Sequence, residues 1–146
     1  MPPKKVSIFL DTSVVLSGLF SATGGARELF RLGKRNILIL YAGKSVLKEA
    51  DGVLLRKKPE LRILLATYLS NARVKTPEQP AEKAKTLARR LMDYAPDAQI
   101  LAEAIQTAPD WFVTHDRQHF LDNADLSELP FQIGTPGDAL LWLREQ

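Results

Sequence analysis

The sequence of 146 residues contains no cysteine and only two histidines, His115 and His119. Without cysteine the chain has no disulfide framework and no thiolate metal site. It also lacks any apolar run near the roughly 18 residues that a membrane-spanning helix needs. Before Asp11 there is only a short apolar run, Val6 to Leu10, which does not resemble a secretory signal. We therefore expect a cytoplasmic protein without a membrane segment.

Charge of either sign is not in large excess. Lys and Arg number 20 and Asp and Glu number 17, which leaves a net charge of +3. This balance permits contact with nucleic acid but does not require it, because surface lysines that aid solubility explain it equally well. The length and the 45% hydrophobic content suit an ordinary globular protein, and we expect one domain over residues 1–146.

What the sequence does contain is an alternation of short apolar runs and helical patterns. Strands are predicted at residues 6–10, 37–41, 72–76 (a weak one, near an edge), 111–114 and 131–133. Helices are predicted at residues 12–20, 26–34, 45–54, 59–69, 80–92, 96–108 and 136–144. Such alternation favours an α/β fold in three layers, with a parallel sheet of about five strands covered by helices on both faces.

Acidic residues stand at the positions where such a fold gathers its ligands. Asp11 ends the first predicted strand and Asp116 follows the fourth, while Glu49 lies in a helix and Asp97 at a helix start. Ligands of parallel sheets bind beyond the carboxyl ends of the strands, where the strand order reverses. If the first and fourth strands are neighbours there, the carboxylates meet. An all-oxygen cluster suits Mg²⁺ or Mn²⁺, and metal-bound carboxylates of this kind serve nucleases.

Each of these acids also has an ordinary structural explanation. Asp11 and Asp97 precede or begin helices and are suited to capping them. Glu49 lies among charged neighbours on what reads as a solvated helix face, and Asp116 suits a turn after a strand. Only convergence of all four in space separates the two interpretations, and the sequence alone leaves them open.

The stretch WFVTHDRQHF, residues 111–120, contains both histidines at a spacing of four. This resembles the zinc-protease pattern H-E-x-x-H, with Asp116 in the place of the glutamate. However, Trp111 to Val113 favours a strand, and the chain offers neither cysteine nor a third histidine as a further ligand. We therefore expect His115 and His119 to be loop histidines, packed or exposed, or contacts to RNA.

Basic residues suggest where RNA could bind. Lys83 and Arg89 lie on the basic face of the predicted helix 80–92, and Arg117 lies between the two histidines. Such a face is commonly just solvated, but its charges also suit a phosphate backbone. The candidate RNA contacts are therefore His115, Arg117, His119, Lys83 and Arg89.

These segments, taken in order, resemble the PIN-domain ribonucleases, and among them the VapC-like toxins of toxin–antitoxin pairs. The likeness spans essentially the whole chain. It is carried by IFLDTSVVLSGLF with Asp11, SVLKEADGVL with Glu49, PDAQILAEA with Asp97, WFVTHDRQHF with Asp116, and the ending IGTPGDALLWL. Each motif alone is weak, and their order and spacing make the resemblance.

The resemblance implies a sheet of strand order 3-2-1-4-5, which sets the first and fourth strands side by side. It implies cleavage of RNA that depends on Mg²⁺ or Mn²⁺, by a metal-bound water that leaves a 5′-phosphate. Asp11, Glu49, Asp97 and Asp116 would hold the metal, with Ser13 and Thr114 orienting carboxylates or water. It also implies an RNA substrate, an antitoxin partner and a homodimer. Leu16, Leu19 and Phe20 are candidate contacts of such a dimer, although burial in the core explains these side chains equally well.

The chain departs from the family pattern at two places. Many relatives carry a further acid shortly after the fourth motif, where this chain has Gln118 and His119, with Asp122 as the nearest substitute. His115 replaces a residue that is often small or basic. One or two metal ions therefore remain open, as does the alternative of a catalytically idle PIN-like module that binds RNA or protein.

Overall fold

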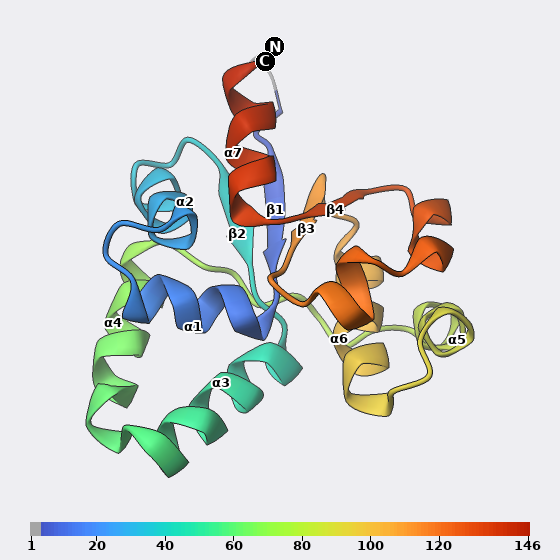
Figure 1. Cartoon of the computed structure of the whole chain (residues 1–146), viewed down its shortest axis with the longest axis horizontal. Coiled ribbons are helices and arrows are strands. Elements are labelled where there is room, and N and C mark those ends of the chain that lie inside the picture. Colours follow the sequence, from blue (N-terminus) through green and yellow to red (C-terminus); the bar gives the residue numbers. More distant parts are fainter. Residues whose placement is uncertain (1–3) are drawn as a thin grey trace.

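The computed structural model describes residues 4–146 and shows a parallel sheet between helices (Figure 1). The strands are β1 (Ser7–Leu10), β2 (Ile39–Tyr41), β3 (Trp111–Val113) and β4 (Gln132–Gly134). The α-helices are α1 (Thr12–Phe20), α2 (Gly25–Lys34), α3 (Lys44–Lys57), α4 (Arg62–Asn71), α5 (Glu82–Leu91), α6 (Ala95–Thr107) and α7 (Pro136–Arg144). Three short helices, η1 (Pro59–Leu61), η2 (Arg117–Leu121) and η3 (Ala124–Glu128), complete the elements. Within residues 4–146, no helix has both the length and the apolar character needed to cross a membrane.

The sheet has the order β2-β1-β3-β4 with all neighbours parallel. Ile8 of β1 lies opposite Leu40 of β2 on one side and Trp111 of β3 on the other. The expected α/β class is confirmed, and so is the expected neighbourhood of the first and fourth predicted strands, which are β1 and β3. The carboxyl ends of β1 and β3 therefore lie at the same edge of the sheet.

The predicted third strand, at residues 72–76, is wrong in extent, so the sheet has four strands rather than five. Of these residues only Lys75 pairs with the sheet, through one parallel bridge to Tyr41, the last residue of β2. Arg73 has a positive φ of 60°, and the N–H groups of Ala72, Arg73 and Val74 all donate to carbonyls at the end of α4. These residues terminate the helix, so they have no N–H groups left for a sheet.

A similar helix ending shortens the second strand. Asn36 has a φ of 62°, and the Ile37 N–H donates to the Leu32 carbonyl of α2 at 3.0 Å. The strand therefore begins at Ile39 rather than at Ile37. In both cases apolar residues that look like strand in the sequence are used to close the preceding helix.

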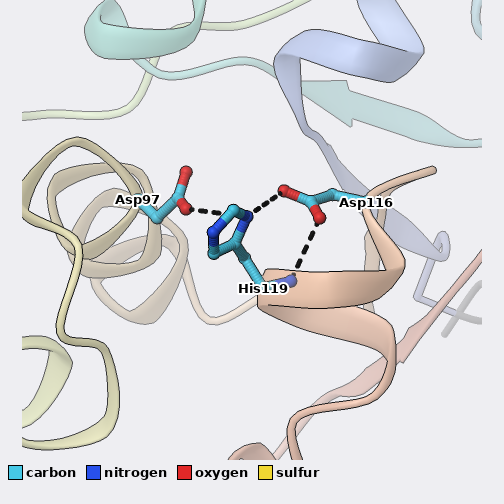
Figure 2. A group of neighbouring side chains, drawn as sticks. All are labelled: Asp97, Asp116 and His119. Atoms are coloured by element: carbon cyan, nitrogen blue, oxygen red, sulfur yellow. Dashed lines mark hydrogen bonds and ion pairs between the residues drawn. The ribbon is translucent and has the colours of Figure 1, made fainter.

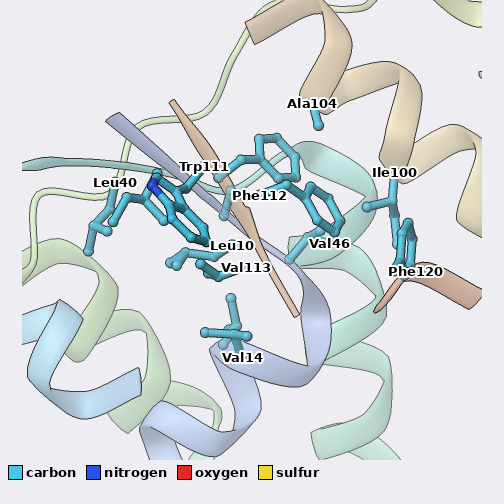
Figure 3. Close-up of a cluster of buried hydrophobic side chains, with 14 of the residues drawn as sticks. Leu10, Val14, Leu40, Val46, Ile100, Ala104, Trp111, Phe112, Val113 and Phe120 are labelled. Atoms are coloured by element: carbon cyan, nitrogen blue, oxygen red, sulfur yellow. The ribbon is translucent and has the colours of Figure 1, made fainter. Parts of the chain in front are cut away.

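The buried residues form one hydrophobic cluster on both faces of the sheet (Figure 3). On one face Phe9 stacks on Phe112 with ring centroids 5.6 Å apart, and Phe120 packs against Phe112 at 4.9 Å. On the opposite face Trp111 contacts Trp142 of α7, with ring centroids 5.8 Å apart. This alternation gives the strands apolar side chains on both faces, as in a sheet covered by helices on both sides.

Glu103 of α6 is a buried carboxylate that the sequence did not single out. Its Oε2 accepts a hydrogen bond from Ser45 Oγ at 2.8 Å, and both of its oxygens lie 3.2 Å from the Ser45 backbone nitrogen at the start of α3. A carboxylate at a helix N-terminus satisfies free N–H groups and interacts favourably with the helix dipole. Glu103 therefore fixes α3, the helix that carries Glu49, against α6.

This contact predicts that Gly43→Ala destabilises the protein. Gly43 has an extended conformation that alanine tolerates, but a Cβ there would collide with Glu103 Oε1. We expect the free energy of unfolding, measured by urea denaturation, to fall by about 1–3 kcal/mol because Glu103 must move.

Gly52→Ala, farther along α3, is the matched control. Its Cβ would meet Arg56 only at 3.4 Å, so the variant should gain about 0.5–1 kcal/mol from the better helix propensity of alanine. A Gly43→Ala protein as stable as its parent would contradict the role given to Glu103.

Candidate active site

Asp11 directly follows β1 at the carboxyl end of the sheet. Its backbone N–H donates to the Val113 carbonyl of β3 at 3.0 Å, so strand pairing fixes its position. The residue is only 5% exposed. Although it occupies the N-cap position of α1, its side chain makes no capping hydrogen bond. Helix capping, which the sequence left open, therefore does not account for Asp11.

The Asp11 carboxylate instead accepts two hydroxyl hydrogen bonds at Oδ2. Thr114 Oγ1 donates at 2.7 Å and Ser13 Oγ at 3.2 Å. The same two hydroxyls also accept N–H groups of the loop after β3. Asp116 N donates to Thr114 Oγ1 and His115 N donates to Ser13 Oγ, both at 3.0 Å. Asp11 and the loop that bears Asp116 are thus joined through Ser13 and Thr114.

Asp116, Asp97 and His119 form a compact group beyond the strand ends (Figure 2). Asp116 Oδ1 accepts the His119 N–H at 3.0 Å, and Asp116 Oδ2 lies 2.9 Å from His119 Nδ1. Asp97 Oδ2 lies 3.5 Å from the same nitrogen. One ligand atom from each residue lies within 4.8 Å of the other two.

Asp97 is the third residue of α6, whose N-cap is Tyr94, so Asp97 does not have the simple N-cap role left open by the sequence. Its side chain is 13% exposed. Its Oδ2 is buried and accepts no hydrogen bond from any of residues 4–146. A buried carboxylate oxygen in this condition is energetically unfavourable unless a cation lies against it.

Glu49 lies on α3 at the rim of the site and is more exposed than the aspartates. It lines a groove between α3 and α6 together with Lys48, Arg56 and Gln99. Neither Glu49 nor Asp11 belongs to the compact group that Asp97, Asp116 and His119 form within residues 4–146. Glu49 is therefore placed at the side of the acid group rather than within it.

The acids nevertheless act on one another electrostatically. Burial raises the pKa of Asp97 to about 6, and the negative charges of Asp116, Asp11 and Glu49 add to this rise in pKa, whereas the charge of His119 opposes it. Burial also raises the pKa of Asp11, and partial burial followed by the charge of Asp11 raises that of Glu49. Negative charge thus accumulates in a partly buried place, the condition that a bound cation relieves.

The two histidines have different surroundings and do not share a zinc-binding helix. His115 Nε2 lies 3.1 Å from Ser17 Oγ, on the side of α1. His119 belongs to the π-helix η2 and contacts Asp97 and Asp116, while its predicted role as an RNA contact stays a prediction. Its position three residues after Asp116 was the one signal in the sequence that pointed to these contacts.

The two predicted basic contacts on α5 lie beside opposite ends of α6. Arg89 of α5 lines a groove with Ala95 and Gln99, beside the turn of α6 that bears Asp97. Lys83 lines another groove with Ile105 near the far end of α6, roughly 12 Å along the helix axis from Asp97. Arg89 therefore lies beside the first turns of α6 and Lys83 beside its far end, and none of the four acids lines either groove.

Arg117 and Asp122 lie at the outer side of η2. Arg117 Nη1 lies 3.6 Å from Asp122 Oδ1, and the two side chains are 73% and 62% exposed. Asp122, the nearest substitute for the missing later acid, therefore faces solvent and is not part of the acid group that includes His119.

Comparison with known proteins identifies the family of this chain. The family described as PIN domain matches residues 7–118, which include all four candidate acids. The chain belongs to the PIN domain family. A search of curated proteins found no match.

Solved structures share the fold of this PIN domain at low sequence identity. VapBC2 from Rickettsia felis bound to promoter DNA is 16% identical, with a TM-score of 0.64 over 88% of this chain and 98% of that one. DNA-bound VapBC from Salmonella typhimurium is 16% identical, with a TM-score of 0.65 over 90% and 98%. VapC20 from Mycobacterium tuberculosis, a toxin that cleaves the sarcin–ricin loop, is 19% identical, with a TM-score of 0.54 over 76% and 91%.

The electrostatics of the PIN domain predict that metal-free protein loses stability as the pH rises. The pKa of Asp97 is about 6 in the folded chain against 3.8 for a free side chain, so between these values the folded state holds the proton more tightly and stability falls with rising pH. Asp97→Asn should therefore raise the free energy of unfolding by about 1–3 kcal/mol near neutral pH, and by less near pH 4.

Urea denaturation in EDTA across this pH range measures the effect. Asp122→Asn, which alters an exposed acid outside the group, should show no such dependence. If Asp97→Asn changed the free energy of unfolding by the same amount at both ends of this pH range, the raised pKa of Asp97 would be refuted.

Proposed function

We propose that this PIN domain is a metal-dependent endoribonuclease in which Asp11, Glu49, Asp97 and Asp116 hold Mg²⁺ or Mn²⁺. The observation that carries the proposal is that acids from separate segments of the chain gather at one edge of the sheet. Asp97 and Asp116 lie together with His119, and Asp11 is joined to the loop that bears Asp116 through Ser13 and Thr114. Burial, together with neighbouring acids, raises the pKa of Asp97, Asp11 and Glu49, so the ionised acids destabilise the fold unless a cation compensates them. The family and the VapC-like fold support the same conclusion.

The donor set fits a hard divalent ion. Asp97 Oδ2 is buried without a hydrogen bond from the described residues, and Asp116 Oδ2 lies close to it across the His119 ring nitrogen. Carboxylate oxygens are the ligands that Mg²⁺ and Mn²⁺ prefer. When bound, such an ion supplies an activated water and stabilises the charge that develops on a phosphodiester.

The remaining contacts of the site keep the acids in place. Thr114 and Ser13 donate to one oxygen of Asp11, which orients its carboxylate. The same hydroxyls accept the N–H groups of Asp116 and His115. A shift of the loop after β3 would therefore disturb the positions of both Asp11 and Asp116. We assign Ser13 and Thr114 the task of holding the carboxylates ready for the ion.

A groove of about 430 Å³ beside Glu49 suits the RNA backbone. Lys48 and Arg56 of α3 line it on one side and Gln99 of α6 on the other. Cations next to acids that hold a metal can bind the phosphates that flank the cleaved one. We assign the substrate path to this groove, with Arg89 farther along the same side of α6.

We also propose that the protein is the toxin of a pair and binds a protein antitoxin, because two solved proteins of similar fold are VapBC complexes. Exposed Phe20, Leu55 and Ile63 lie on α1, α3 and α4, which pack against one another (Figure 1). Large exposed apolar side chains are typical of protein interfaces. The suggested homodimer stays a prediction, and of its candidate contacts Leu19 is buried in the core. A toxin that cuts cellular RNA would act in the cytoplasm.

The nuclease proposal predicts RNA cleavage that needs both the metal and the acids. End-labelled single-stranded RNAs and hairpins, including a sarcin–ricin loop hairpin, should be cut in Mn²⁺ or Mg²⁺ and left intact in EDTA. Asp11→Asn and Asp97→Asn should each lower the rate on the order of 10²-fold or more, because the metal is lost or misplaced.

Asp122→Asn is the matched control, since it removes an exposed acid from the same region and should change the rate by less than about twofold. Cleavage that persists in both site variants would rule the nuclease out. RNA that binds but is never cut with any divalent ion would instead establish the idle binding module.

The groove beside Glu49 predicts a separate effect on substrate binding. Replacing Lys48 and Arg56 together by Gln should raise KM about 10-fold or more at low salt and leave kcat within about threefold, because these cations contact flanking phosphates. Replacing Lys34 and Arg35 by Gln at the end of α2 removes the same charge elsewhere and should leave KM unchanged. Equal effects of the two pairs would show that only net charge matters.

A further inference from the structure

Among the described residues, His119 contributes the one nitrogen atom of the compact group at the site. Its Nδ1 lies 2.9 Å from Asp116 Oδ2 and 3.5 Å from Asp97 Oδ2, and all three atoms lie within 4.8 Å of one another (Figure 2). A ring nitrogen between two carboxylates either donates a proton to them or shares a metal ion with them. Its placement in the group therefore bears on which ion the site takes.

The backbone around His119 holds the ring in this position. In η2 the N–H of Leu121 donates to the Asp116 carbonyl at 3.0 Å and that of Asp122 to the Arg117 carbonyl at 2.8 Å, which are the five-residue spacings of a π-helix. Such turns are rare and concentrate at functional sites. This turn brings the His119 N–H onto one oxygen of Asp116 and its ring onto the other.

An aromatic side chain also stacks on the face of the His119 ring. The Tyr94 ring lies 5.8 Å from the His119 ring, with an angle of 24° between the planes. Tyr94 immediately precedes α6, the helix that bears Asp97. The imidazole is thus oriented by backbone, carboxylate and aromatic contacts at once, as a preorganised ligand is.

We propose that His119 is a metal ligand, and that Nδ1 completes with Asp97 and Asp116 a mixed nitrogen and oxygen site that favours Mn²⁺ over Mg²⁺. The inference rests on the proposed function, since it concerns the ion of the same site. Imidazole suits transition metals, whereas Mg²⁺ favours oxygen ligands and gives up its waters reluctantly. For this role the ring carries its proton on Nε2 and directs the Nδ1 lone pair to the ion.

Calorimetric titration of the metal-free full-length chain with MnCl₂ and with MgCl₂ tests the preference. The parent should bind Mn²⁺ at least about 10-fold more tightly than Mg²⁺. His119→Asn, which keeps a side-chain donor near Asp116 but removes the imidazole, should weaken Mn²⁺ binding about 10-fold or more and change Mg²⁺ binding by less than about threefold. His115→Asn, which alters the histidine beside Ser17, should leave both affinities unchanged.

Pulsed electron paramagnetic resonance of the Mn²⁺-loaded protein tests the ligand directly. The parent and His115→Asn should show coupling to a directly bound nitrogen, and His119→Asn should not. Histidine labelled with ¹⁵N in the unaltered chain should shift this coupling, a result that does not depend on any variant folding.

The outcomes separate the inference from the function on which it rests. A parent that binds neither ion overturns the proposed metal-dependent function as well as the role of His119. A parent that binds Mn²⁺ and cuts RNA without nitrogen coupling, or whose preference for Mn²⁺ survives His119→Asn, overturns only the ligand role of His119.

Discussion

The parallel pairing of β1 with β3 is the constraint on which the site depends. It places Asp11 beside Thr114, which is 103 residues away in the chain, and the bond between them is 2.7 Å long. The Asp11 N–H extends the pairing by one step beyond β1, to the Val113 carbonyl. Because parallel strands end at the same edge, every acid that follows them is directed to one place. The other contacts of the site are arranged around this edge.

The site has an electrostatic cost for the fold. Burial and neighbouring acids raise the pKa of Asp97 and of Asp11, so the ionised forms destabilise the protein when no cation is bound. If these positions served only the stability of the fold, apolar or neutral polar residues would suit them better than buried acids. Proteins keep such unfavourable groups chiefly at sites where they bind or react. The neighbouring hydroxyls of Ser13 and Thr114 and the ring of His119 lessen the cost without removing it.

Much of the fold, and the place of the main acids, could be predicted from the sequence because strands buried on both faces are continuous apolar runs. Such runs ended at Asp11 and preceded Asp116, and the alternation with helices made the strands parallel. The failures have a common cause. At Asn36 and Arg73 the chain takes a left-handed conformation that closes a helix, and apolar residues after it then resemble longer strands than exist. Side-chain pattern does not encode such closures.

Two contacts of the site region were not predicted, for different reasons. His119 faces the acids because η2 is a π-helix, a geometry that α-helical spacing does not describe. Glu103 looks like an ordinary helix residue, and only the packing of α6 on α3 shows that it holds the N-terminus of the helix bearing Glu49. Both depend on contacts between segments distant in sequence or on unusual backbone turns, which periodicity cannot reveal.

The most direct test of a shared divalent ion is an anomalous difference map from crystals of the protein soaked in Mn²⁺. A strong peak is expected in contact with both Asp97 and Asp116 at the carboxyl ends of β1 and β3. A fully soaked crystal with no peak there, or with manganese bound only elsewhere on the surface, would contradict the shared ion.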